Sequence, residues 1–113
     1  MTAITGAHVM IFTRNEAADR AFLRDVLEIP CIDSGGGWLI FKLPPTELGV
    51  HGAENGFHQV YFICDDVDAF VTDMVGKGIE TRPIEEQSWG RSTGVVLPGG
   101  GLLGIYQASH ARP

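Results

Sequence analysis

The stretch GFHQVYF (residues 56–62) repeats the pattern of GAHVMIF (residues 6–12): a glycine, one residue, a histidine, three residues and a phenylalanine. The repeat puts His8 and His58 at equivalent positions. Both stretches belong to apolar runs rich in residues that favour strands, so they predict buried strands over residues 7–13 and 57–64. Two matching strands in a chain of 113 residues indicate an internal duplication.

The segments that follow each copy support the duplication, because they come in the same order. Apolar residues recur every three to four positions over residues 16–28, which predicts an amphipathic helix that Pro30 ends. A second helix is predicted to begin after Asp65 or Asp66. Further strands are expected at 31–34, 38–43 and 47–51 in the first half, and at 79–86, 91–97 and 102–107 in the second. The order is therefore βαβββ followed by βαβββ.

Shorter matches extend the repeat to the ends of the two halves. LPP (residues 43–45) corresponds to LPG (97–99), and LGVH (48–51) corresponds to LGIY (103–106). We predict a single α+β domain of two modules, at about residues 5–52 and 56–108. The modules would form one curved, cupped mixed sheet with the helices outside. A two-fold relation between them would bring His8 and His58 together in the cleft, where paired imidazoles suit a divalent metal.

Composition and charge restrict the class of partner. The net charge of −6 argues against nucleic acid and against an anionic membrane surface, and it says little about a small-molecule substrate. The start of the chain lacks the basic and apolar regions of a signal peptide. Cys31 and Cys64 fit neither a disulfide framework nor a metal knuckle, so we expect reduced thiols in a cytoplasmic protein.

The duplicated pattern resembles the vicinal oxygen chelate superfamily, which includes glyoxalases, bleomycin-resistance proteins and extradiol dioxygenases. The resemblance rests on the histidine in the first strand of each half, on QSWGRS (residues 87–92) and on LPGGGLLGIYQ (97–107), and it covers roughly residues 5–108. It is specific for the fold, and no motif in it is specific for one activity.

In members of this superfamily that use a metal, the resemblance implies ligands on the first and last strands of each module. His8 and His58 match the first-strand positions, whereas Gly49 and Gly104 stand where a glutamate is common. A divalent metal (iron, zinc, manganese or nickel) would then need His51 as a third ligand. Glu47 or His51 could complete the shell or act as general base, although each could equally be a solvated side chain.

Other residues are candidates for contact with a ligand in an apolar cleft. Trp38, Phe62, Trp89 and Tyr106 could stack on a flat molecule, as could Phe41, although most of these aromatic residues are expected to belong to the core. Arg91 could meet an anionic group, or could be an ordinary surface charge.

Two functions follow from these residues. The first is a metal-dependent enzyme of lyase, isomerase or dioxygenase type, which the paired histidines favour. The second is a metal-free small-molecule-binding protein of the bleomycin-resistance type, which the two glycines at the expected carboxylate positions favour. In either case the resemblance implies a homodimer, in which the modules pair within a chain or exchange between subunits.

Overall fold

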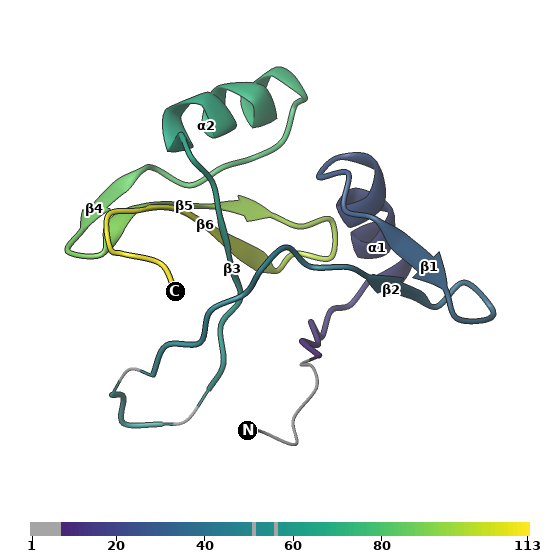
Figure 1. Cartoon of the computed structure of the whole chain (residues 1–113). Coiled ribbons are helices and arrows are strands. Elements are labelled where there is room, and N and C mark those ends of the chain that lie inside the picture. Colours follow the sequence, from purple (N-terminus) through teal and green to yellow (C-terminus); the bar gives the residue numbers. More distant parts are fainter. Residues whose placement is uncertain (1–7, 51, 56) are drawn as a thin grey trace.

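The computed structural model describes residues 8–50, 52–55 and 57–113. Within this part of the chain there are two helices and six strands (Figure 1). In chain order they are α1 (Glu16–Asp25), β1 (Cys31–Asp33), β2 (Leu39–Phe41), β3 (Tyr61–Ile63), α2 (Val67–Gly76), β4 (Glu85–Gln87), β5 (Gly90–Val96) and β6 (Leu102–Ala108).

The second module forms a four-stranded sheet in the order β3-β6-β5-β4. β3 runs parallel to β6, while β6, β5 and β4 are antiparallel neighbours. Helix α2 covers one face of this sheet (Figure 1). As predicted, α2 begins at an aspartate: the Asp66 side chain accepts a hydrogen bond from the Ala69 N–H at 3.1 Å. Of the edge strand expected at 79–86, only the end is found, as β4. Pro83 interrupts the rest because proline has no backbone N–H to donate to a neighbouring strand.

The hydrophobic core lies between α2 and the sheet, and it also takes in the helix of the first module. Phe22 of α1 is buried in the same cluster as Met74 of α2. The sheet contributes Val95, Leu97, Leu103 and Ile105, all of them at most 3% exposed. Side chains from both halves of the chain therefore share one core.

A polar contact reinforces this junction between the modules. The carboxylate of Asp19 in α1 is 5% exposed, and its Oδ1 accepts a hydrogen bond from the Gly99 N–H at 2.7 Å. Gly99 belongs to the turn between β5 and β6. A Cβ at this position would collide with Thr13 and lie 3.0 Å from Asp19 Oδ2, so the close approach requires glycine.

The first module differs from the prediction. Residues 8–13 and 47–50 form no strand, and β1 and β2 pair only with each other in a separate two-stranded sheet. The predicted strands at 7–13 and 47–51 are therefore wrong over the residues that the structure describes, because no neighbouring strand takes up their backbone N–H and C=O groups. The cupped sheet is accordingly divided into two pieces.

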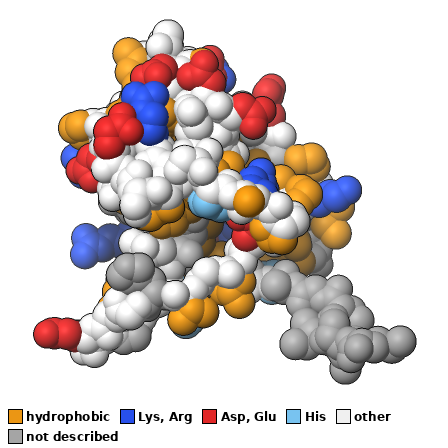
Figure 2. All heavy atoms as spheres, turned by 60° about the vertical axis from the view of Figure 1, so that its left-hand side comes forward, with side chains coloured by type: hydrophobic (Ala, Val, Ile, Leu, Met, Phe, Trp, Pro, Cys, Tyr) orange, Lys and Arg blue, Asp and Glu red, His pale blue; other side chains and the backbone are white. Residues whose placement is uncertain are grey.

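Several apolar side chains of these unpaired segments face solvent. Phe12, Leu48, Val50 and Phe57 are 66–96% exposed, and the described residues of 44–50, 52–55 and 57–60 extend away from the body of the molecule (Figure 1). Figure 2 shows exposed apolar side chains low on the molecule and acidic ones gathered at its top. The radius of gyration is 15.1 Å, against about 13 Å for a compact chain of this length. No helix in the described ranges is long and apolar enough to cross a bilayer.

Candidate functional site

The face of the sheet opposite α2 carries three aromatic rings. Side chains alternate along β6: Leu103 and Ile105 belong to the core under α2, so Tyr106 points to the other face. There it meets Tyr61 and Trp89. The ring centroids are 4.9 Å apart for Trp89 and Tyr106 and 5.7 Å apart for each of the other two pairs, with interplanar angles of 75° to 87°. This is the favoured edge-to-face geometry, and we call these three residues the aromatic cluster.

Gly104 makes room for the aromatic cluster. It is the β-sheet partner of Tyr61 in the parallel register of β3 and β6. A Cβ on Gly104 would lie 2.9 Å from Cγ of Tyr61 and closer still to two other ring carbons. The position at which the resemblance leads one to expect a glutamate is thus covered by the ring of Tyr61. Gly49, the corresponding residue of the first module, has open space around it.

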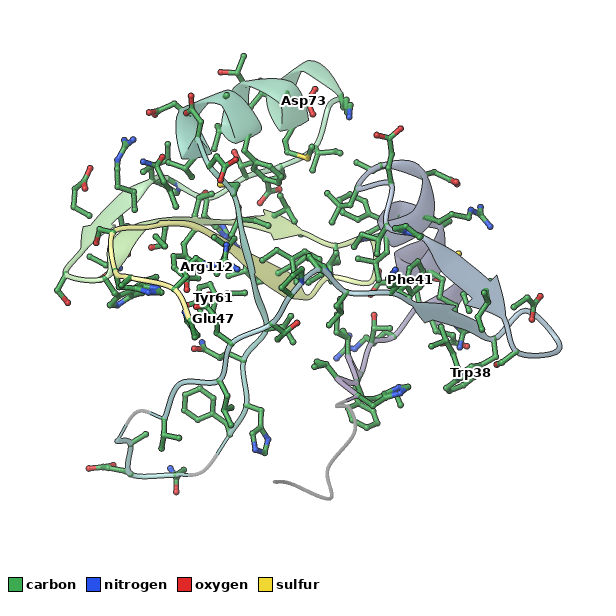
Figure 3. All side chains as sticks on the ribbon, viewed as in Figure 1. Trp38, Phe41, Glu47, Tyr61, Asp73 and Arg112 are labelled. Carbon is green, nitrogen blue, oxygen red and sulfur yellow. The ribbon has the colours of Figure 1, made fainter. Side chains whose placement is uncertain are left out.

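An ion pair between residues 65 positions apart in the chain lies beside this cluster. Glu47 of the first module and Arg112 of the C-terminal segment form a hydrogen-bonded ion pair, and Figure 3 shows both residues next to Tyr61. The Glu47 side chain is only 19% exposed, whereas that of Arg112 is 42% exposed. The hydrogen bond that Arg112 donates to Glu47 raises the pKa of Arg112. Glu47 is therefore a half-buried carboxylate that already has a cationic partner.

The hydroxyl of Tyr106 has a partner in the C-terminal segment as well. It lies 3.0 Å from Nε2 of His110, whose Nδ1 lies 2.9 Å from the carbonyl oxygen of Ala111. Since a carbonyl only accepts, Nδ1 carries the proton, and Nε2 of the neutral ring accepts from the hydroxyl. Burial, and then the charge of Glu47, raise the pKa of Tyr106. The neutral phenol is therefore favoured at this position.

A cleft of about 370 Å³ adjoins the cluster. Tyr61 and Gly104 form part of its lining, and His58 lies in the same lining. The other side is provided by residues 10–12 of the first module. The cleft therefore lies between the two modules, where the duplication predicted it, and combines apolar walls with a few polar groups, as small-molecule sites do.

The histidines predicted as metal ligands are only partly placed by the structure. His58 lines the cleft, whereas His8 is exposed and is not among the lining residues. His51 lies outside the described residues. Over the described ranges, no three histidine, cysteine, aspartate or glutamate side chains are grouped to hold a metal ion. The part of the chain that the structure describes therefore does not by itself assemble the three protein ligands that a resident divalent metal normally has.

Two of the predicted aromatic ligand contacts lie elsewhere. Trp38 and Phe41 belong to the β1–β2 hairpin, well away from Tyr61 in Figure 3. The indole of Trp38 is covered by the guanidinium of Arg20, 4.7 Å from the ring centroid. Phe62 is half-buried and packs against the core, on the α2 side of β3. Of the predicted aromatic residues, the structure brings Trp89 and Tyr106 together.

Arg91 forms ion pairs with carboxylates of its own chain. Its guanidinium is 2.7 Å from the carboxylate of Asp68 in α2 and 2.9 Å from that of Glu86 in β4. The ion pair lowers the pKa of Asp68. Two carboxylates thus compensate the charge that would have met an anionic ligand.

The sequence reasoning missed three residues of this site: Tyr61, His110 and Arg112. Tyr61 lies within the repeated stretch itself. Because side chains alternate along a strand, Tyr61 and Phe62 point to opposite faces of the sheet. A glycine at 104 was a usable signal, since an aromatic ring on a neighbouring strand often covers such a residue. No comparable signal marked the C-terminal residues, which the sequence presents as an ordinary polar tail.

Comparison with known proteins supports the fold. No family model matches the sequence, and neither does any curated protein. Among solved structures, the antibiotic-binding protein TnmS3 from Streptomyces sp. CB03234 is 17% identical with a TM-score of 0.69, over 96% of this chain and 100% of that one. Lactoylglutathione lyase from Agrobacterium tumefaciens is 19% identical with a TM-score of 0.66, over 94% and 96%.

A third similar structure is the fosfomycin resistance protein FosX from Listeria monocytogenes, which is 18% identical with a TM-score of 0.61, over 94% of this chain and 95% of that one. All three similar structures belong to the vicinal oxygen chelate superfamily. They include a binding protein and a lyase, so the likeness extends to the fold and leaves the activity open. The chain therefore has the glyoxalase/bleomycin-resistance fold, as its sequence resemblance predicted.

Proposed function

We propose that this protein binds a small aromatic molecule without a metal, in the cleft beside the aromatic cluster. The observation that carries the proposal is the ring of Tyr61 over Gly104. It occupies the place of a carboxylate ligand and adds an aromatic surface to the cleft lining. Stacking on such a surface suits a flat ligand.

The surroundings of the cluster support the same function. Residues 10–12 give the cleft an apolar wall, and Tyr106 and His110 supply a hydrogen-bonded polar group close by. TnmS3, which is similar in fold, is an antibiotic-binding protein. The combination favours sequestration of a ligand over a reaction on it.

A metal-dependent enzyme is the second candidate, because His58 lies in the cleft lining. His8 and His51 would have to join it, with Glu47 as general base. Glu47 is engaged by Arg112, so this function would require that ion pair to open. The metal content of the protein distinguishes the two candidates.

The chain's two tryptophans provide the test of ligand binding. Trp38→Phe leaves Trp89 as the only indole, and Trp89→Phe leaves Trp38. We expect planar aromatic probes to quench the first variant in a saturable, stoichiometric way, with or without EDTA, and not the second. Absence of quenching across a broad set of probes would contradict the proposal. Stoichiometric metal that is lost in His58→Ala would instead support the enzyme.

We also propose that the protein forms a homodimer through residues 9–12 and 48–50. These segments expose apolar side chains and belong to no strand, while β3 is an edge strand of its sheet. A second copy carries the same strand-forming segments and could pair with both. Sedimentation of the unaltered protein should show a dimer, which Phe12→Lys weakens. Val75→Lys, at an exposed apolar residue of α2, is the control and should leave the dimer intact. A monomer at high concentration would refute this assembly.

The cytoplasm is the compartment we propose for this function. Cys31 and Cys64 are both free thiols, which suits a reducing environment. Burial raises the pKa of the Cys64 thiol and so keeps it in the unreactive protonated form.

A further inference from the structure

We propose that Glu47 and the aromatic cluster form a subsite for an organic cation carried on an aromatic ring, and that Arg112 of this chain occupies that subsite when no ligand is bound. The inference rests on the proposed function and specifies the class of its ligand. It follows from how the last residues of the chain are held against the open face of the sheet.

The C-terminal segment is attached to the aromatic cluster by a series of polar contacts. The Ser109 N–H donates to the carbonyl oxygen of Trp89 at 3.0 Å, which continues the antiparallel pairing of β5 and β6 by one residue. His110 accepts from Tyr106, and their rings lie 5.9 Å apart between centroids. Arg112 then reaches Glu47. The segment thus places its cationic side chain beside the cluster.

The charges around this position favour a cation. Glu47 is largely shielded from water, and a shielded carboxylate needs a partner of opposite charge. The carboxylates of Glu47 and Asp65 both act on Arg112 and favour its charged form. Without Arg112, the carboxylate of Glu47 would therefore lie beside the aromatic cluster without its cationic partner. Aromatic faces also attract cations, so the same place suits a ligand that combines a positive charge with a flat ring.

Arg112 is suited to leave when a ligand arrives. Its side chain is 42% exposed, and the residues after Ala108 belong to no strand. Ion pairs with such an exposed partner contribute little to stability. A ligand cation can therefore replace the guanidinium at Glu47 while the core and the sheet stay as they are.

A pair of probes of equal shape separates charge from stacking: N-methylquinolinium, which is cationic, and 1-methylnaphthalene, which is neutral. Titrations would follow Trp89 fluorescence in the Trp38→Phe protein. Arg112→Ala should tighten the cation by roughly three- to tenfold and leave the neutral probe within twofold, because it frees the subsite. Glu47→Gln should weaken the cation by about tenfold and spare the neutral probe.

Arg82→Ala is the matched control, since Arg82 is an exposed arginine paired with Glu80 at 3.7 Å. It should change neither probe. A chain that ends at Ala108 gives a second way of removing Arg112, and it should behave as Arg112→Ala does. Thermal melts of every variant verify that the folded protein is being titrated.

The outcomes also separate this inference from the function on which it rests. Equal binding of both probes in every variant would overturn the cation subsite and leave the binding function standing. Weaker binding of both probes in Arg112→Ala would contradict the proposal that a ligand cation displaces Arg112 from Glu47. Binding of neither probe in any variant would reject the proposed function itself.

Discussion

The ring of Tyr61 lies on the backbone of Gly104, its partner across the parallel strands β3 and β6. This contact lets an aromatic side chain lie flat on the sheet, brings that ring within 5.7 Å of both Trp89 and Tyr106, and removes the position of a carboxylate ligand. The relation of these two residues is the observation that supports the proposed aromatic cleft.

Gly104→Ala should destabilise the protein by about 1–3 kcal/mol, because the added Cβ overlaps the ring of Tyr61. Urea unfolding measures the change. Gly101→Ala is the control: a Cβ there meets nothing within 4 Å, so its effect should stay within about 0.5 kcal/mol. If Gly104→Ala is harmless, the ring does not rest where the structure places it. Adding Tyr61→Ala should remove most of the overlap penalty.

Most of the second module could be predicted from sequence because β4, β5 and β6 each have a partner strand nearby in the chain, whereas β3 pairs with the distant β6. Strands β5 and β6 are joined by the turn at residues 98–101 and pair over their whole length. Helix α2 packs back on them. In the first module the same apolar pattern occurs at residues 8–13, but there the structure provides no partner strand. Hydrophobic periodicity reports that a segment suits a strand, and it cannot report what the strand pairs with.

The site was predicted less well for a related reason. FHQVYFIC (residues 57–64) is apolar on both faces, so its sequence does not tell which of Tyr61 and Phe62 points to the core. The structure places Phe62 against the core and Tyr61 in the cleft. The Glu47–Arg112 pair joins residues too far apart in sequence for any local pattern to connect them.

Asp19→Ala should cost about 1–3 kcal/mol, because the Gly99 N–H would lose its acceptor at the junction of the two modules. Asp19→Asn keeps an oxygen for this hydrogen bond. Oδ2 of Asp19 is buried and has no hydrogen-bond partner, so the uncharged amide should destabilise the protein less than alanine does. Urea unfolding of the two variants gives the comparison. Equal losses for Asn and Ala would contradict a hydrogen-bonding role.

Arg91→Gln should leave the affinity for both aromatic probes within twofold, since Asp68 and Glu86 already engage the guanidinium. It should instead change the response to acid. The ion pair lowers the pKa of Asp68, so its stabilising effect is present above the ordinary pKa and is lost as the pH falls through the lowered one. Unfolding at pH 7 and pH 3 should therefore differ less in the variant. A marked loss of affinity for the probes would instead indicate that Arg91 contacts the ligand.

Tyr106 should ionise above pH 10, the ordinary pKa of tyrosine. The chain has two tyrosines, so in the Tyr61→Phe protein the phenolate absorbance near 295 nm reports Tyr106 alone. Burial and the charge of Glu47 raise this pKa, while Arg112 opposes them. Glu47→Gln should therefore lower the titration midpoint, and Arg112→Ala should raise it.

The raised pKa of Tyr106 also determines how the stability of the protein changes at alkaline pH. The folded state holds the Tyr106 proton more tightly than the unfolded state, so this stabilising effect is complete below pH 10 and is lost as the pH rises through the raised pKa. Tyr106→Phe has no proton to lose, so its free energy of unfolding should fall less between pH 9 and pH 11. A midpoint at or below pH 10, or one that Glu47→Gln leaves unchanged, would show that the carboxylate does not lie beside the phenol.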